Sequence, residues 1–279
     1  MSKNLSPVAQ QEFDNLVHHV YQGGSKLQGC TRLRSGVVGD IYKFRTMGKG
    51  LANQKASQAD VTPMDVNHTL VNCVLENWNA PEYTDVFDQA EVNFEEKSEL
   101  AKTIAHALGR RSDQLIIDAL NQSAPTATVA TSVGGAGSGL NIEKLAAAGS
   151  ELDDNEVPEE GRIMVASSKS KWTLLQETEV GSSDYNTVKA LAHGEIDTFM
   201  GFKFVFFGTR SEGGITSAAN VYDGYAFHMD AMGLAVGIQQ KTEINYVPEK
   251  TSWLCNGLLK AGAVAIDETG IVKVQATET

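Results

Sequence analysis

The stretch NFEEKSELAKTIAHALGRRSDQLIIDALNQ, residues 93–122, carries the strongest structural signal in the chain. Its apolar side chains recur at the three- and four-residue intervals of an amphipathic helix. Asn93 can cap that helix, and the acidic residues of its first turn favour the positive end of the helix dipole. Gly109 interrupts the pattern at a cost of about 1 kcal/mol relative to alanine. The pattern predicts one long helix with these residues along its apolar stripe: Leu100, Ile104, Leu108, Leu115 and Ala119.

The sequence after this helix alternates helical and strand-like pieces. A run of small residues over 123–140 reads as a linker, and NIEKLAAAGSEL (141–152) reads as a short helix. RIMVAS (162–167) is typical of a short buried strand, and SKWTLLQET (170–178) of a helix with Trp172 and Leu175 turned inward. This middle portion therefore predicts a compact α+β unit.

Aromatic residues alternate in the segment that follows, GEIDTFMGFKFVFFGT (194–209). Phe202, Phe204 and Phe206 recur at every second residue, which is the period of a strand with one phenylalanine face. Glu195 and Asp197 upstream read as a solvated turn. The closing residues predict four returning strands, in NVYDGYAFHMDAMGLAVGI, KTEINYVP, SWLCNGLLKAGAVAID and TGIVKVQAT.

Before the long helix, two strand-like pieces flank a long polar stretch. GDIYKFRTM (39–47) and TLVNCVLENW (69–78) have strand patterns, whereas residues 48–63 contain glycine and few apolar residues. Two strands joined in this way predict an extended hairpin that projects from the body. Because an isolated hairpin is marginally stable in water, we expect this one to lie on a neighbouring subunit.

Composition narrows the class of protein further. The chain has 279 residues, a net charge of −12 and a pI near 4.9, which argues against tight nucleic-acid binding. Three isolated cysteines, Cys30, Cys73 and Cys255, read as buried reduced thiols. We expect a soluble protein made in the cytosol with no membrane partner, because neither a signal peptide nor an apolar run of membrane-spanning length is apparent.

Motifs for catalysis or cofactor binding are weak. The glycine-rich VGGAGSGL (133–140) lacks the lysine and hydroxyl residue of a phosphate-binding loop, and its glycine spacing does not fit a dinucleotide fingerprint. The histidines and cysteines show no metal-ligand spacing, and no nucleophile motif occurs. We therefore expect no enzyme activity, cofactor or metal.

Basic side chains offer candidates for contacts between subunits. Arg45, Lys49 and Lys55 lie in or beside the polar hairpin tip, where they can meet acidic patches of a neighbour. Arg110 and Arg111 form a basic doublet on the long helix. This doublet favours contact with DNA or with another chain, or else it belongs to a solvated helix face.

The order of these pieces resembles a tailed-phage major capsid protein of the HK97-like fold. The resemblance rests on the acidic-led helix, the RIMVASSKSKWTLLQ strand-to-helix step, ALAHGEIDTFMGFKFVFFGT and the closing strands. It implies an α+β chain with an N-terminal arm (1–27), an extended loop (28–75), a peripheral domain with the long spine helix (76–138), an axial domain (139–220), and return strands of both domains (221–279).

The resemblance also implies a structural function, with no catalytic reaction. Copies of the chain would form pentamers and hexamers of an icosahedral virion shell around double-stranded DNA, assembled in the host cytoplasm. A separate scaffolding protein, a portal protein, weakly contacted DNA and a possible decoration protein are the expected partners. Lys49, Lys55 and Asn256 do not match the motif by which some relatives crosslink, so no covalent crosslinks are expected.

Three alternatives stay open at this point. An encapsulin-like nanocompartment shares the fold and encloses enzymes. A cytosolic nucleotide-dependent enzyme would use the glycine loop 133–140. Another virion structural protein, such as a decoration or tail component, would not form closed shells.

Overall fold

The computed structural model describes residues 23–87, 96–176, 198–208 and 220–277, together with six single residues, 210, 212, 214, 215, 217 and 218. The expected arm up to residue 22, the cap at Asn93 and the turn with Glu195 and Asp197 lie outside the described residues.

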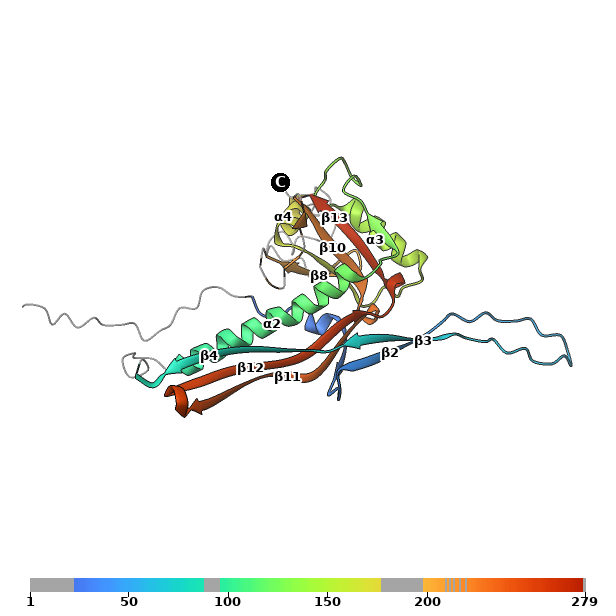
Figure 1. The fold of residues 1–279 in the computed structure, drawn as a ribbon. Coiled ribbons are helices and arrows are strands. Elements are labelled where there is room, and N and C mark those ends of the chain that lie inside the picture. The colour runs from blue at the N-terminus through green and yellow to red at the C-terminus, as the bar shows by residue number, and fades with distance from the viewer. Residues whose placement is uncertain are drawn as a thin grey trace, which may run out of the picture.

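The described chain forms two sheets and a projecting hairpin (Figure 1). A four-stranded sheet has the order β1-β11-β12-β4, and a larger sheet has the order β5-β13-β10-β6-β8-β7 with β9 paired to β10. Strands β2 and β3 form the hairpin. The strand bounds are β1 Arg32–Ser35, β2 Ile41–Met47, β3 His68–Val74, β4 Glu76–Asp85, β5 Ala127–Val129, β6 Arg162–Ser167, β7 Thr198–Phe199, β8 Phe202–Phe207, β9 Ser217–Ala218, β10 Val221–His228, β11 Met232–Val247, β12 Ser252–Ala265 and β13 Ile271–Thr277. The α-helices are α2 Glu96–Gln122, α3 Ile142–Asp154 and α4 Ser168–Gln176, and the short 3₁₀ turns are Gln28–Cys30, Met229–Ala231, Pro248–Lys250 and Glu268–Gly270.

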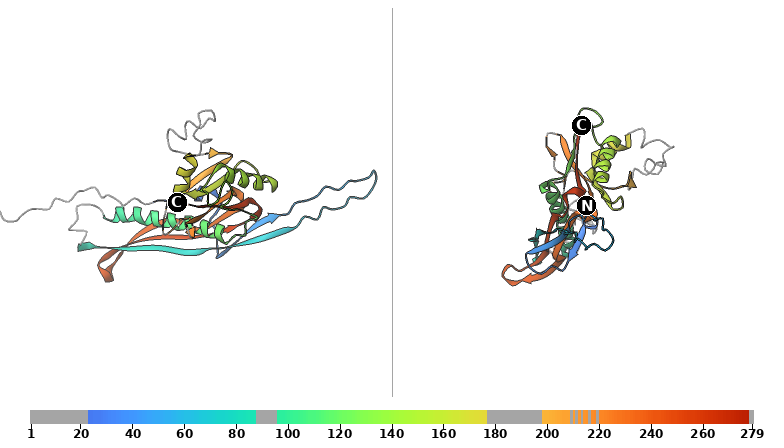
Figure 2. Two further views of the ribbon diagram at one scale, coloured as in Figure 1. Left: turned by 90° about the horizontal axis from the view of Figure 1, so that it is seen from above. Right: turned by 90° about the vertical axis from the view of Figure 1, so that its right-hand side faces the viewer.

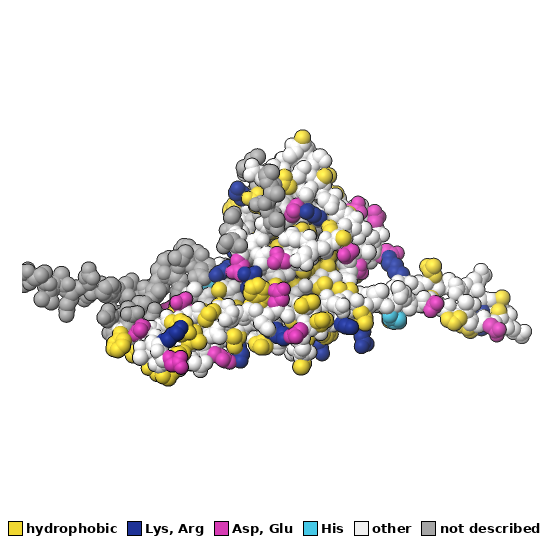
Figure 3. Space-filling view, viewed as in Figure 1, with side chains coloured by type: hydrophobic (Ala, Val, Ile, Leu, Met, Phe, Trp, Pro, Cys, Tyr) yellow, Lys and Arg dark blue, Asp and Glu magenta, His cyan; other side chains and the backbone are white. Residues whose placement is uncertain are grey.

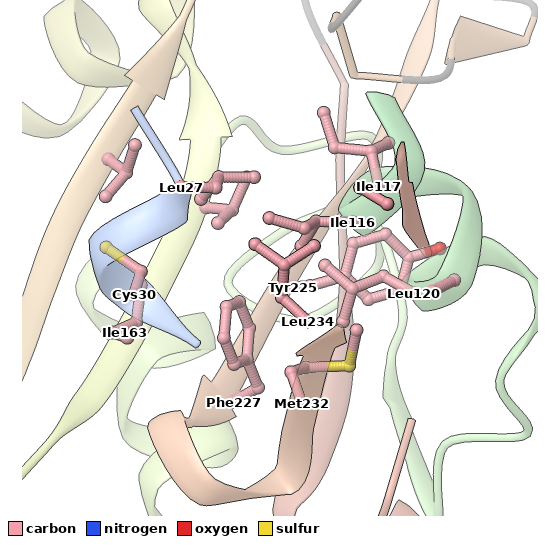
Figure 4. Packing of buried hydrophobic residues seen from close by; sticks show 14 of the residues in the cluster. Leu27, Cys30, Ile116, Ile117, Leu120, Ile163, Tyr225, Phe227, Met232 and Leu234 are labelled. Carbon is pink, nitrogen blue, oxygen red and sulfur yellow. The ribbon is translucent and has the colours of Figure 1, made fainter. Parts of the chain in front are cut away.

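The predicted long helix is confirmed as α2, which lies along the four-stranded sheet (Figures 1 and 2). Its first half packs Ile104 and Leu108 over Gly257 of β12. Its second half carries Ile116, Ile117 and Leu120 into a core shared with the larger sheet (Figure 4). No helix in the described part of the chain is long and apolar enough to span a bilayer.

Gly109 is required by a close crossing and not by a bend in the helix. A Cβ at this position would lie 3.0 Å from the backbone nitrogen of Ser25. The segment before the first 3₁₀ turn therefore crosses α2 at a distance that a larger side chain would prevent.

The larger sheet is buried on both faces. On one face, Phe202 and Phe204 of β8 pack against α3 and α4, which confirms the predicted phenylalanine face. On the other face, Val205 and Phe207 join the core beneath α2. The strand carries apolar residues on both faces because α3 and α4 cover one face and the core with α2 covers the other, apart from the exposed Lys203.

The helix after β6 turns a different side inward from the predicted one. In α4, Leu174 is fully buried and Leu175 is nearly so, but Trp172 is 60% exposed. The prediction for Trp172 was wrong because Trp172 lies two residues before the fully buried Leu174, about 200° around the helix axis, and so on the opposite side from it.

The stretch expected as a linker over 123–140 is more ordered than predicted. It contains β5, which pairs in parallel with β13. The turns that follow are fixed by the buried Lys144, whose Nζ donates to the carbonyls of Ser138 and Gly139 at 2.6 and 3.0 Å. Asn141 caps α3 as its side chain accepts from the Lys144 backbone N–H.

The returning strands are confirmed with one change of boundaries: the first predicted piece is divided into β10 and the start of β11, and the second predicted piece is the end of β11. These strands divide between the two sheets. The 3₁₀ turn Met229–Ala231 separates β10 of the larger sheet from β11 of the smaller one. β11 and β12 form a long antiparallel pair with register shifts around Ile238, and β13 then returns to the larger sheet. Near its end the chain thus passes twice between the two sheets, once before β11 and once after β12. These two connections link the sheets covalently.

Candidate assembly interface

The hairpin is the element that extends farthest from the body among the described residues (Figures 1 and 2). β2 and β3 pair in register from Ile41–Val74 to Met47–His68. Residues 48–67 continue beyond the paired strands as an exposed tip without regular strand. The predicted projecting hairpin is therefore confirmed, although the second strand begins at His68 and breaks after Val74.

The two faces of the hairpin differ in burial. On the inner face, Phe44 and Cys73 pack in a small cluster with Leu75, Ala235 and Ile266 of the body. The outer face exposes four apolar side chains, of which Met47 is the most exposed at 69%. The others are Ile41, Leu70 and Val74. Exposed apolar side chains interleaved with Lys43 and Arg45 on a face that the chain itself leaves uncovered are typical of a surface that meets another molecule.

The base of the hairpin is fixed to the body by close packing and one ion pair. Gly233 leaves room for the Phe44 ring, since a Cβ there would lie 2.7 Å from ring carbons. Lys260 on β12 bonds the Asp40 carboxylate at 2.6 Å, and this ammonium lowers the pKa of Asp40. The direction in which the hairpin leaves the body is therefore set by its own chain.

The structure places three of the five basic candidates on this hairpin. Arg45 is exposed on the outer face of β2, and Lys55 is exposed at the tip. Lys49 forms an exposed ion pair with Glu156, at 2.8 Å, beyond the end of α3, and lowers the pKa of that carboxyl. Lys49 thus forms an exposed ion pair between the hairpin tip and its own body, of a kind that contributes little to stability.

The other two candidates lie apart from the hairpin on α2. Arg111 bonds Glu212 at 2.6 Å and its guanidinium lies 4.1 Å from the centroid of the Trp78 ring. Arg110 also interacts within its own chain. Arg111 lines a groove of about 350 Å³ with Trp78 and Leu115, beside the edge strand β4. Whether either arginine touches another chain stays a prediction.

A second group of exposed apolar residues lies at the far end of the four-stranded sheet. Figure 3 shows hydrophobic side chains gathered there, opposite the hairpin. Ile244 and Tyr246 of β11 and Tyr83 of β4 are each more than 40% exposed. These residues could not be recognised from sequence, because apolar alternation in a strand does not tell which face the body covers.

Several described groups that could carry chemistry are buried or bonded within the chain. Within the described ranges no three His, Cys, Asp or Glu side chains gather to hold a metal. All three cysteines are buried, and burial raises the pKa of Cys73 to about 11. In the glycine-rich loop, the Ser138 hydroxyl donates to the Val133 carbonyl at 2.7 Å. That loop is an internally bonded turn.

A spine helix on a sheet, a second sheet buried on both faces and a projecting hairpin define the HK97-like capsid class of shell protein. The chain belongs to the phage capsid protein family, which it matches over residues 5–278. It is a major capsid protein, a structural component of the virion shell.

Solved capsid structures share this fold at low sequence identity. The structure of Mycobacterium phage Che8 aligns with a TM-score of 0.74 at 16% identity, covering 98% of both chains. The capsid of cyanophage P-SCSP1u aligns at 0.75 and 14% identity, covering 98% of this chain and 94% of the other. The head of Helicobacter pylori bacteriophage KHP40 aligns at 0.77 and 10% identity, covering 99% of both. No curated protein sequence matches the chain closely enough to count as a relative.

Proposed function

We propose that the hairpin is the principal contact between subunits, and that copies of this chain form pentamers and hexamers of an icosahedral shell around double-stranded DNA. The observation that carries this proposal is the uncovered outer face of the hairpin. Covering side chains such as Leu70 and Val74, which are 56% and 58% exposed, is worth about 1 kcal/mol each. Contacts of this size are individually weak but add up around a closed shell.

The division into arm (1–27), extended loop (28–75), peripheral domain (76–138), axial domain (139–220) and return strands (221–279) is part of the same proposal. The two sheets support it except at β5, which belongs to the larger sheet but falls within the range given for the peripheral domain. The larger sheet, with α3 and α4 on one face, would form the axial part around five- and six-fold centres. The smaller sheet with α2 would form the peripheral part. The double-faced core around β8 would keep the axial part rigid.

Further partners belong to the proposal as well. A separate scaffolding protein, a portal protein and a possible decoration protein would bind the shell, which would assemble in the host cytoplasm. The net charge of −12 favours weak contact with the enclosed DNA. The protein would have no catalytic activity and no covalent crosslinks. Asn256 supports the last point, because its side-chain oxygen is buried within the sheet.

The test compares the outer face of the hairpin with another exposed apolar site. Leu70→Ser together with Val74→Ser should leave a folded subunit that forms few or no shells by negative-stain electron microscopy. Met200→Ser, which also removes an exposed apolar side chain but lies on the turn between β7 and β8, is the matched control and should assemble normally. Deletion of residues 48–63 tests the tip in the same assay. Normal shells from both hairpin variants would contradict the proposal.

A further inference from the structure

Helix α4 presents a basic and aromatic face to the surface. Lys169, Trp172 and Gln176 are exposed and recur at helical spacing, so they form one stripe along the nine-residue helix. The Trp172 side chain is 60% exposed, and the Lys171 ammonium lies 5.7 Å from the centroid of its ring. The helix contains no acidic residue, and both of its lysines lie in the first turn, where the helix dipole is also positive. This face therefore suits a partner that is both anionic and apolar.

A strongly acidic segment lies between α3 and β6. Residues 151–160, ELDDNEVPEE, contain six carboxylates and no cation. Two of these carboxylates are paired within the chain, Asp153 with Arg162 and Glu156 with Lys49. For the other four, all exposed, the described ranges contain no ion-pair partner. They are Glu151, Asp154, Glu159 and Glu160. We call residues 154–160 the acidic turn.

The α4 face and the acidic turn lie at opposite ends of one strand. β6 begins beside the acidic turn, where Arg162 donates to the Pro158 carbonyl at 3.0 Å, and it ends at Ser167, directly before α4. Its six residues span about 20 Å. Figure 1 shows α4 on the left and the end of α3 on the right of the upper part of the molecule. The α4 face is therefore too far from the acidic turn of its own chain to contact it.

We propose that the α4 face of one copy, formed by Lys169, Lys171 and Trp172, binds the acidic turn of the next copy. The inference rests on the proposed shell function, in which the larger sheets of neighbouring copies lie side by side around five- and six-fold centres. Different surfaces at opposite ends of a subunit make a head-to-tail contact, which is the kind that closes a ring. Opposite charges at the two ends fix the direction of each contact, because copies that meet with like ends repel each other.

The contact combines an aromatic anchor with charge pairs. The Trp172 indole can pack on the exposed ring of Pro158, and tryptophan is among the residues that contribute most binding energy at protein interfaces. The two lysines of the α4 face can then pair with Glu159 and Glu160, which follow that proline. A second copy suits this face better than packaged DNA. Two lysines neutralise few phosphates, whereas the acidic turn offers the indole an apolar surface as well.

The first experiment reverses the charges of the two surfaces and measures assembly. Lys169→Glu with Lys171→Glu should raise the chain concentration needed for shells about tenfold, which corresponds to 1.4 kcal/mol. Glu159→Lys with Glu160→Lys should have a similar effect. The combined four-residue variant should assemble again, because each contact is then attractive with its direction of charge reversed. Trp172→Ala should impair assembly while leaving the urea midpoint of the subunit nearly unchanged.

A charge-matched control distinguishes a specific pairing from a change in net charge. Glu143→Lys with Glu268→Lys reverses two exposed carboxylates outside the acidic turn and should assemble normally on its own. Combined with the two lysine reversals, it restores the net charge of −12 but should not restore assembly. All variants should first show the urea midpoint of a folded subunit.

The second experiment identifies the contact in shells mixed from ¹⁵N-labelled and unlabelled chains. A carbodiimide joins an amine to a carboxylate that lies against it. Mass spectrometry should find Lys169 or Lys171 joined to a carboxylate of the acidic turn from a chain of the other isotope. The Lys102–Glu99 pair, 2.8 Å apart, should crosslink within one chain and serves as the internal control.

The outcomes separate this inference from the proposed function. Shells without mixed-isotope crosslinks between α4 and the acidic turn would overturn the inference alone, as would normal assembly of the variant with both lysines reversed. A wild-type chain that forms no shells would count against the function. Crosslinks would then be sought in the concentrated chain, and their absence there would overturn the inference too. If the lysine reversals weaken binding of a DNA duplex but leave assembly unchanged, the face binds phosphate and the inference is wrong.

Discussion

Asp113 is the residue whose replacement we expect to be most damaging outside the apolar core. Its side chain is fully buried on α2 and accepts from the Ser25 hydroxyl at 2.9 Å and from the backbone N–H groups of Lys26 and Leu27 at 3.0 Å. These bonds hold the segment that carries the fully buried Leu27 into the core shared by both sheets. Asp113→Ala would leave two backbone donors without an acceptor, at about 1–3 kcal/mol each.

The expected loss for Asp113→Ala is about 3–5 kcal/mol, because Arg210 also loses the Asp113 carboxylate, which lies 3.9 Å from its guanidinium. Urea unfolding of the unassembled chain, followed by tryptophan fluorescence, measures it. Asp118→Ala on the same helix is the control. Asp118 is half-buried and accepts from the Gln114 side chain at 2.6 Å, so its loss should be below about 1 kcal/mol. Equal effects of the two variants would refute the argument that Asp113 anchors the segment.

The pH dependence of this anchor has an unusual sign. Burial raises the pKa of Asp113 above its ordinary value of 3.8, and this outweighs the lowering by the bonds from Leu27, Lys26 and Ser25 and by the charge of Arg210. A raised pKa in the folded state adds stability that is fully present below 3.8 and is lost as the pH rises through the raised value. The stability of the wild type relative to Asp113→Asn should therefore increase as the pH is lowered from neutral toward 3.8. A relative stability that decreases over this range would show that the hydrogen bonds outweigh burial.

Two further changes test the packing of the sheets. Gly262→Ala should destabilise by about 1–3 kcal/mol and displace the hairpin, since a Cβ there would lie 1.9 Å from the Val74 carbonyl oxygen. Gly29→Ala, which meets nothing within 4 Å, is its control, and equal urea midpoints for the two would contradict this reasoning. Leu174→Ala in α4 should cost about 2–5 kcal/mol and Trp172→Ala about 0.5 kcal/mol, measured in the same way. The reverse order would mean that the exposed side of α4 is misassigned.

Periodicity accounts for what the sequence could predict. One pattern repeats over several residues in the long helix, in the phenylalanine face of β8 and in the paired strands of the hairpin. Each of these elements could therefore be predicted from a short stretch of sequence. The hairpin needed one more clue, the polar stretch between its strands. Its exposed outer face also follows from alternation, once Phe44 is known to face the body.

Contacts between distant segments account for what the sequence could not predict. Asp113 and Lys26 are 87 positions apart, and nothing in the local sequence DQLII distinguishes a buried anchor from a solvated helix residue. Lys144 in the expected surface of a short helix is likewise fully buried on backbone carbonyls. The strand β5 was not predicted, because it has only three residues and pairs with β13 almost 150 positions later in the sequence. Contacts with distant segments decide whether such residues are buried and what they pair with. The periodicity of the local sequence does not reveal these contacts.

The hairpin combines a fixed base with an unsupported tip, and this combination suits a subunit that must fit more than one neighbour. Phe44 and the Lys260–Asp40 pair set where the strands leave the body. Beyond Met47, the Lys49 ammonium pairs with the Glu156 carboxylate of the body at 2.8 Å, and both side chains are so exposed that water screens the attraction and the pair contributes little to stability. Lys49→Gln should therefore leave subunit stability unchanged within about 0.5 kcal/mol in urea. If that variant instead unfolds at much lower urea, the tip is held by its own body, and the argument that it adapts to a neighbour loses its basis.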